Sequence, residues 1–268
     1  MKILSGYWIS NIDNRFTNFG DILGPYILSK YDINLIYKSS QPQLYTIGSL
    51  LHMMPNDYEG FIWSTGYMYP TKVLSLKNDP ICVRGKLSKK YFKNDTSNTE
   101  VGDGGLLLDK IYTPKKTNIR YKLGVFPNYC DIINMRDDPI EKYDAFNRPD
   151  VKIIDPRNYI ETVIDDLNSC DNVVTSSLHG AVVCDAYGIN YGVFSARETD
   201  LAIHKMQGSF KFQDYFSIYD KEFYGVDLSL NHVTSFEECL SICKPNNKPN
   251  LNNIKYYLEK SIDRIKNI

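Results

Sequence analysis

The chain has 268 residues, of which 43% are hydrophobic, and its 31 basic and 32 acidic residues leave a net charge of −1. This composition is typical of a globular protein, and the length fits one large α/β unit. The balanced charge gives no electrostatic support for nucleic-acid binding, so we expect no nucleic-acid partner. Neither a signal peptide in residues 1–10 nor a run of about 18 apolar residues is present. We therefore expect a cytoplasmic protein without a transmembrane segment.

The first half of the chain alternates short apolar runs with glycine-containing turns and helical patterns. The glycine-containing stretch 18–28 is predicted to feed a helix, and further helices are expected to open at 48–52, to span 85–92 and to start at 103. Strands are predicted at 2–9, 33–37, 44–47, 60–65, 72–76 and 80–84. The segment 93–100 is predicted as a polar loop.

A Lys-, Pro- and Asn-rich segment, residues 112–120, has no periodicity and is predicted to link two halves. The alternation then resumes, with strands predicted at 122–126, 151–154, 172–175 and 191–194. Helices are predicted at 131–135, 157–169, 197–206 and 236–243, and an amphipathic one at 250–268. We therefore expect two units with parallel sheets, residues 1–115 and 121–249, with the last helix crossing back to the first unit.

Residues 173–188 are the centre of this organisation, because a β-branched run leads directly into a polar elbow and a helix. Ser176 and Ser177 are residues that open helices, and Gly188 is placed to end this one. His179 and Gly180 fall in the first turn, where free N–H groups and a partial positive charge bind phosphate or carboxylate. His179 would be a useful proton donor there, although a buried core histidine is the plainer interpretation.

Eight short motifs occur in the order found in one enzyme family. They are NFGDILGPYI (18–27), IGSLL (47–51), WSTG (63–66), VRGKLS (83–88), VGDGGLLL (101–108), LGVFPNYCD (123–131), VTSSLHGAVVCDAYGI (174–189) and KFQDYF (211–216). By these motifs the chain resembles the polysaccharide pyruvyl transferases, in particular the bacterial exopolysaccharide branch. The resemblance covers roughly residues 1–220.

The resemblance implies a GT-B-like fold of two Rossmann-like lobes with the donor between them. It also implies transfer of the enolpyruvyl group of phosphoenolpyruvate to two hydroxyls of one sugar, giving a pyruvate ketal and phosphate. His179 and Asp21 are the expected acid and base. The expected donor-binding residues are Arg84, Ser176, Ser177, Leu178, His179, Gly180 and Lys211. Acceptor-binding or supporting roles are expected for Asn18, Ser49, Asp103 and Asp214.

Each of these assignments has a plainer alternative. The alternative for Arg84 is an ion pair with a surface carboxylate, and Asp21 and Asp103 are each placed to cap a helix. Many relatives carry Arg at the position of Ser177, a charge that Lys211, Lys205 or Arg197 would have to replace. Relatives also often carry His where this chain has Asn128, which puts a proton-transfer role at that position in doubt.

The partners expected are phosphoenolpyruvate and a saccharide, with no cofactor and no metal, and the pattern is compatible with peripheral contact with a lipid-linked glycan. None of the six cysteines forms a CxxC pair, and Cys239 and Cys243 would hold a metal only with ligands from elsewhere. Reduced, buried thiols are therefore predicted. Two other functions stay open: a nucleotide-sugar glycosyltransferase, with Glu198 as the candidate ribose ligand, and an inactive carbohydrate-binding relative. The oligomeric state is not predicted.

Overall fold

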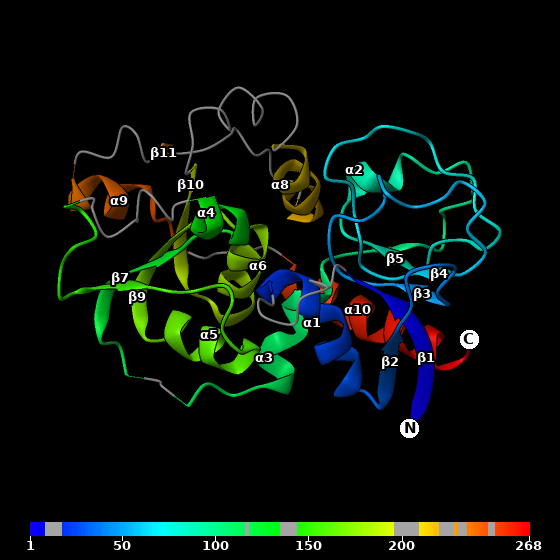
Figure 1. The fold of residues 1–268 in the computed structure, drawn as a ribbon, viewed down its shortest axis with the longest axis horizontal. Coiled ribbons are helices and arrows are strands. Elements are labelled where there is room, and N and C mark those ends of the chain that lie inside the picture. The colour runs from blue at the N-terminus through cyan, green and yellow to red at the C-terminus, as the bar shows by residue number, and fades with distance from the viewer. Residues whose placement is uncertain are drawn as a thin grey trace.

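The computed structural model describes residues 1–8, 18–115, 118–134, 144–195, 209–219, 228–229, 235–245 and 250–268. Each half of the chain forms a parallel sheet, and a two-stranded sheet adds to the first half (Figure 1). This confirms the α/β class with parallel sheets. The helix predicted at 197–206 lies outside the described residues.

The first sheet has the strand order β2-β1-β3-β4. Its strands are β1 (Lys2–Tyr7), β2 (Ile33–Tyr37), β3 (Leu44–Tyr45) and β4 (Phe61–Ile62). A further pair, β5 (Cys82–Val83) with β6 (Glu100–Val101), continues this arrangement, since the N–H of Ser64 donates to the carbonyl of Cys82 over 2.9 Å. The N–H of Arg84 donates to the carbonyl of Thr65 over 3.0 Å on the same border. β6 falls at the end of the segment that was predicted to be a loop.

The second sheet has the order β11-β10-β9-β7-β8, with every pair parallel. Its strands are β7 (Tyr121–Phe126), β8 (Val151–Ile153), β9 (Cys170–Thr175), β10 (Asn190–Ser195) and β11 (Leu228–Ser229). The later residues of β7 and β9, LGVF and VVT, are apolar or β-branched and buried, as expected of strands that are covered on both faces.

The helices connect the strands and cover the sheets. They are α1 (Phe19–Ser29), α2 (Lys86–Lys89), α3 (Leu108–Ile111), α4 (Tyr129–Asn134), α5 (Ile160–Leu167), α6 (Leu178–Tyr187), α8 (Ser209–Phe216), α9 (Phe236–Ile242) and α10 (Leu251–Lys266), with 3₁₀ turns at η1 (Gly104–Leu107) and η4 (Ser217–Tyr219). One buried apolar cluster takes residues from both halves, among them Leu4, Leu23, Val173 and Leu178. The two sheets therefore share a core.

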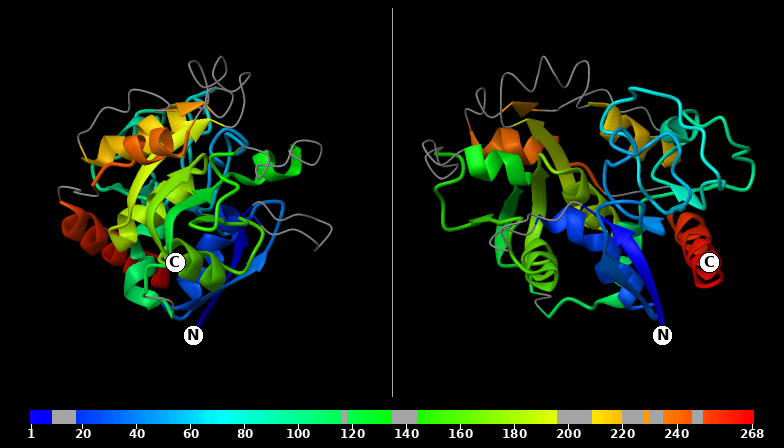
Figure 2. Two further views of the ribbon diagram at one scale, coloured as in Figure 1. Left: turned by 90° about the vertical axis from the view of Figure 1, so that its left-hand side faces the viewer. Right: turned by 45° about the vertical axis from the view of Figure 1, so that its right-hand side comes forward.

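The last helix, α10, packs against the first half of the chain (Figures 1 and 2). Its apolar face is buried through Ile254, Leu258, Ile262 and Ile265. The indole N–H of Trp63 donates to the hydroxyl of Ser261 over 2.8 Å, in a fully buried contact. This hydrogen bond lies inside an apolar interface, where an unpaired indole N–H would be costly. It therefore fixes the register of the helix.

Two predicted elements are wrong. Residues 48–52 form a turn instead of a helix, because Gly48 has a φ of 132° and its carbonyl accepts a hydrogen bond from the N–H of Gly66. Residues 72–76 form no strand; only Leu74 pairs, through an isolated bridge to Phe92. Short apolar runs between glycines are compatible with a helix, a strand or a turn. Here hydrogen bonds to other segments of the same chain determine the structure.

Candidate functional site

The elbow between β9 and α6 is held by the side chain of Thr175. Its hydroxyl donates to the carbonyl of Phe126 over 2.8 Å and accepts from the N–H of Ser177 over 3.0 Å. Ser177 is the N-cap residue in an extended conformation, and Gly188 ends α6 in the left-handed region with a φ of 72°. The first turn of α6 is thereby fixed in position at the carboxyl end of the sheet, where ligands bind in open α/β folds.

His179 lies in that first turn and faces Asp103, which comes from the other half of the chain. The distance from His179 Nε2 to Asp103 Oδ2 is 3.7 Å, which is too long for a hydrogen bond. The Asp103 side chain is fully buried and that of His179 is 12% exposed. Within the described residues, neither of these two atoms has a hydrogen-bond partner. Buried polar atoms are normally paired, so this gap between two reactive groups is a candidate site.

Asp103 is also a helix cap, as the plainer interpretation had it. Its Oδ1 accepts the N–H of Gly105 over 2.9 Å at the start of η1. Only the second oxygen therefore faces His179. Burial raises the pKa of the Asp103 carboxyl to about 6, which places its titration close to neutral pH.

The charge state of His179 follows from its surroundings. Burial lowers its pKa to about 3, and the positive charges of Arg84 and Lys211 act in the same direction. The imidazole is therefore neutral in the unliganded protein, and its approach to Asp103 is not a salt bridge. A bound anion would reverse this, because a negative charge beside an imidazole favours its protonated form.

Gly20 and Gly180 allow close packing at the starts of α1 and α6. A Cβ at Gly20 would lie 2.1 Å from His179 Nδ1, so α1 passes directly against the imidazole ring. A Cβ at Gly180 would lie 2.2 Å from the hydroxyl oxygen of Thr175. Gly180 was expected to bind the donor; in the structure its small size is required by contacts within the chain itself.

Asp21 occupies the first turn of α1, and the side-chain amide of Asn18 donates to its Oδ2 over 2.8 Å. Burial raises the pKa of Asp21 to about 6, against the opposing effects of Asn18 and the positive charge of Lys211. Since Lys211 acts on both Asp21 and His179, this lysine of α8 contributes positive charge to the same region. Arg197 and Lys205, the other candidates for that charge, lie outside the described residues.

Arg84 is fully buried and its guanidinium is bonded inside the protein. Nε donates to Asp214 over 3.0 Å, one terminal nitrogen donates to the hydroxyl of Ser49 over 2.7 Å, and the other donates to the carbonyl of Tyr67. Asp214 accepts two further bonds, from the N–H and the hydroxyl of Ser88. Arg84, Ser49 and Asp214 are therefore one cluster that holds α8 against the first half of the chain.

Ser176 performs a similar role on the other side of the elbow. Its hydroxyl donates to Asp131 over 2.5 Å and accepts the N–H of Asn128 over 2.9 Å. The side-chain oxygen of Asn128 accepts the N–H of Asp131 at the start of α4, so Asn128 works as a cap. Sequence reasoning missed Ser88, Thr175 and Asp131 as supporting residues; their place within the quoted motifs was the only signal.

Comparison with known proteins gives a family match that covers part of this site. The family model described as "Polysaccharide pyruvyl transferase" matches residues 59–195, which include Arg84, Asp103 and the whole elbow from Ser176 to Gly180. The match covers half of the chain. The protein belongs to the polysaccharide pyruvyl transferase family.

One curated protein also resembles this chain. An uncharacterized protein of Acanthamoeba polyphaga mimivirus is 28% identical to it over 175 residues, which are 60% of this chain and 55% of that protein. The chain thus spans about half the length of this curated relative. No solved structure matches the chain.

Within the described ranges, no group of three or more His, Cys, Asp or Glu side chains could hold a metal ion. None of the helices that the structure describes is both long and apolar enough to cross a membrane. Five cysteines are described as free thiols, and Cys82, Cys170, Cys184 and Cys239 among them are buried. Glu198, the candidate ribose ligand of a glycosyltransferase, lies outside the described residues.

Proposed function

We propose that this transferase moves the enolpyruvyl group of phosphoenolpyruvate onto two hydroxyls of one sugar, forming a pyruvate ketal and releasing phosphate. The observation that carries the proposal is the pair of buried, unpartnered atoms, His179 Nε2 and Asp103 Oδ2, at the N-terminus of α6. An imidazole at a helix N-terminus, where anions bind readily, supports this proposal, and both residues lie inside the segment that matches the family.

The donor would be held by the first turn of α6 and by Lys211. The backbone N–H groups of Leu178, His179 and Gly180 are the ones that an α-helix leaves without an intrahelical partner, and they favour a phosphate or carboxylate. Lys211 would supply the positive charge that relatives carry at the position of Ser177. Arg84, bonded to Asp214, would act on the donor through its charge and through the placement of α8 instead of through direct contact.

The proposed reaction begins with protonation of the donor. A bound dianionic phosphate raises the pKa of His179, so the imidazole can carry a proton and pass it to the methylene carbon of the enol. Asp21 accepts the proton of the first sugar hydroxyl as its oxygen bonds to C2. The C2–O bond to phosphate then breaks, the second hydroxyl bonds to C2, and its proton leaves with the phosphate.

Asp103 has a supporting role in this scheme. Its free oxygen faces the imidazole at 3.7 Å, so a small movement on donor binding would allow it to accept a hydrogen bond from protonated His179. A carboxylate with a pKa of about 6 suits this role, since it is ionised at neutral pH and binds a proton more readily than a solvated aspartate.

The two halves of the chain would then divide the work in a GT-B-like manner. Residues 121–249 would hold the donor, residues 1–115 the acceptor, and α10 would join them. Because phosphoenolpyruvate is a cytoplasmic metabolite, the reaction would take place in the cytoplasm, on an exopolysaccharide or another glycan precursor. A lipid-linked precursor is compatible with this arrangement.

The proposal is tested by incubating the protein with phosphoenolpyruvate and a panel of hexosides, and by measuring phosphate release and the ketal product by mass spectrometry. Thermal-shift titrations with phosphoenolpyruvate and with UDP-sugars accompany the assay. We expect stabilisation by phosphoenolpyruvate and acceptor-dependent phosphate release. Stabilisation by UDP-sugars alone would instead identify a glycosyltransferase, and no response to either donor would indicate a carbohydrate-binding relative.

A further inference from the structure

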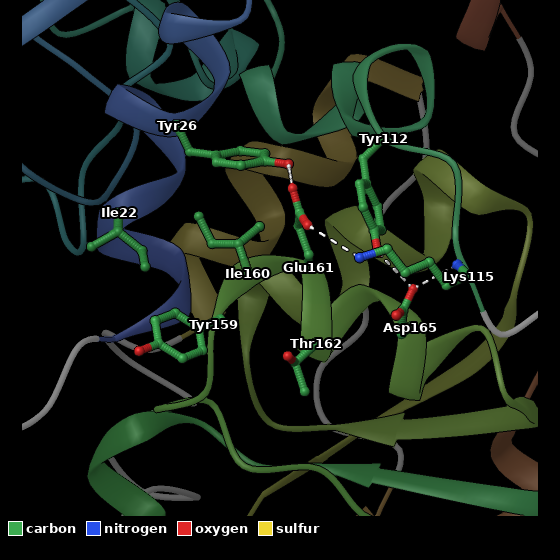
Figure 3. A pocket seen from close by; sticks show the side chains of 9 residues that line it. All are labelled: Ile22, Tyr26, Tyr112, Lys115, Tyr159, Ile160, Glu161, Thr162 and Asp165. Atoms are coloured by element: carbon green, nitrogen blue, oxygen red, sulfur yellow. Dashed lines mark hydrogen bonds and ion pairs between the residues drawn. The ribbon is translucent and has the colours of Figure 1, made fainter.

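A cavity of about 440 Å³, which neither His179 nor Asp103 lines, lies between α1, α5 and the connecting segment 112–115 (Figure 3). Residues from both halves of the chain line it, because α1 belongs to the first half and α5 to the second. Its volume lies within the range of about 300–1,000 Å³ that small-molecule sites occupy. The reaction proposed above makes no use of it.

The walls of this cavity combine aromatic rings with fixed carboxylates. Tyr26 donates its hydroxyl proton to Glu161 over 3.2 Å, and Tyr112 donates to Asp165 over 2.9 Å. The N–H of Lys115 also donates to Asp165 over 2.9 Å, as Figure 3 shows. Burial raises the pKa of Tyr112 to about 12, so its hydroxyl stays protonated. Each carboxylate is thus held in place and keeps lone pairs that can accept further hydrogen bonds.

Tyr159 is an exposed aromatic residue among those that line the cavity. Its side chain is 87% exposed, although it precedes the buried start of α5. Figure 3 shows its ring near the side chain of Ile22 on α1 and apart from the ring of Tyr26. An exposed aromatic ring next to hydrogen-bonding groups is the combination that binds amphipathic ligands, with one apolar face and a polar rim.

The charged groups of the cavity indicate whether an anionic, cationic or neutral amphipathic ligand fits. Two carboxylates face one lysine, Lys115, whose ammonium lies 4.0 Å from Glu161. This balance disfavours an anion such as phosphoenolpyruvate or a nucleotide. The tyrosine hydroxyls, the lysine and a backbone N–H already compensate the carboxylates, so the cavity does not require a cation either. A neutral ligand with many hydroxyls and an apolar ring face fits these walls.

The position of the cavity on α1 separates it from the reacting groups. Ile22 and Tyr26 line the cavity, whereas Asp21 belongs to the candidate site. Neighbouring residues of an α-helix point about 100° apart, so the two regions lie on different sides of α1. The loop before Tyr159 nevertheless contacts the start of α1, where the N–H of Phe19 donates to the carbonyl of Pro156 over 2.8 Å.

We propose that this cavity binds a sugar unit of the acceptor glycan that is not itself pyruvylated. The inference rests on the proposed function, since a polymeric saccharide acceptor extends beyond the unit that reacts. One sugar ring would stack on Tyr159 while its hydroxyls bond to Glu161 and Asp165.

The test measures saccharide binding directly, in the absence of phosphoenolpyruvate. Maltotriose, cellotriose and mannotriose are titrated into the full chain and followed by saturation-transfer NMR and calorimetry. We expect at least one trisaccharide to bind, and Tyr159→Ala to weaken its binding at least tenfold. The matched control is Tyr256→Ala on α10, which removes another tyrosine that is 53% exposed but lies outside the cavity. It should bind as the unchanged protein does.

Three results would overturn the inference: no binding of any of the three sugars, equal binding by Tyr159→Ala, or displacement of the bound sugar by phosphoenolpyruvate. Displacement would mean that the sugar occupies the reacting site. Glu161→Gln provides a second variant, and we expect weaker binding because a carboxylate accepts hydrogen bonds more strongly than an amide. If the protein binds a sugar in the cavity but transfers no pyruvyl group, the proposed function is wrong and the cavity is still a saccharide site. The failure of the proposed function is thus distinguishable from the failure of the sugar site.

Discussion

At the scale of single residues, His179 is the group whose chemistry is most directly testable. Ala removes both hydrogen bonding and proton transfer, whereas Gln keeps a hydrogen-bond donor and cannot transfer a proton. If His179 is the acid, both variants should lower kcat by about 10²–10⁴-fold. Steady-state kinetics with phosphoenolpyruvate and a hexoside measure this. A Gln variant with a near-normal kcat and a raised KM would limit His179 to donor binding.

Asp103 should show a conflict between stability and function. Its pKa is raised from the usual 3.8 to about 6 in the folded protein, so folding favours the protonated form. The stability that this proton supplies is present below about pH 4 and is lost as pH rises through 6, a loss of about 3 kcal/mol. Asp103→Asn keeps the cap to Gly105 and has no charge to bury. We therefore expect it to be more stable than the unchanged protein above pH 6, and less active.

Urea unfolding at pH 4 and pH 7.5 checks the prediction for Asp103. The difference between the two proteins should shrink towards pH 4, where both carry an uncharged side chain at this position. His179 titrates in the opposite sense, since a lowered pKa costs stability as pH falls, but it is present in both proteins. A variant that is less stable at pH 7.5 would contradict the assignment of burial as the dominant effect on Asp103.

Residue-level reasoning from the sequence located the elbow but not the partners of its charged groups. The strand and Gly188 around His179 follow local rules and lie where they were expected, and Ser177 occupies the N-cap position although its side chain makes no cap hydrogen bond. Arg84 illustrates what local rules leave out. Its carboxylate partner, Asp214, lies 130 positions later in the chain, and no periodicity connects the two. The burial of Arg84 is a consequence of tertiary packing alone.

At the scale of the elements, helix α8 is attached to the first half of the chain through the buried ion pair between Asp214 and Arg84. Removing Asp214 leaves the guanidinium of Arg84 buried without its counter-charge, which typically costs about 3–5 kcal/mol. Asp214→Ala should therefore lower the free energy of unfolding by that amount. Asp263→Ala is the matched control, because Asp263 pairs with Lys266 on the exposed side of α10. Its cost should stay below about 0.5 kcal/mol. Equal costs in urea titrations would mean that the Arg84–Asp214 pair does not hold α8.

The start of α1 should control the imidazole of His179. Ala favours helices over Gly by about 1 kcal/mol, yet a Cβ at Gly20 would lie 2.1 Å from His179 Nδ1. Gly20→Ala must displace the ring, and we expect a large fall in kcat with the fold retained. Gly188→Ala is the control: nothing lies within 4 Å of the added carbon, but the φ of 72° is unfavourable. It should cost about 1–2 kcal/mol of stability and leave kcat unchanged.

Equal kcat values for these two glycine variants would contradict the close approach of α1 to His179. Far-UV circular dichroism of both proteins establishes that each is folded before the kinetics are compared. The readout therefore separates an effect on the imidazole from a general loss of stability.

The element scale also indicates where sequence patterns lose information. Long periodic segments such as α10 and the run of β9 are found within a residue or two of their predicted places. The short runs between residues 44 and 101 form strands of only two residues, and the segment at 48–52 is a turn. In these places backbone hydrogen bonds to distant segments, and not local propensity, decide the structure.

At the scale of the whole molecule, the alternation of strands and helices predicted parallel sheets correctly, but a pattern of elements does not place two sheets relative to each other. The apolar cluster that includes Leu4, Leu106, Val173 and Leu178 draws on both halves. A common core makes each half depend on the other for burial of its apolar surface. This dependence bears on the proposed division into an acceptor half and a donor half, because two halves with one core should not unfold separately.

Pulse labelling of thiols during urea unfolding tests this dependence. Cys82 lies in β5 of the first half and Cys170 in β9 of the second, and both are buried. Burial also raises the pKa of both thiols, so they react slowly until their surroundings open. We expect both cysteines to become reactive at one urea concentration, as in a single cooperative transition. Peptide mass spectrometry assigns the labelled sites. A lower midpoint for either cysteine would establish two independently stable units, and the shared cluster would then be an interface between domains.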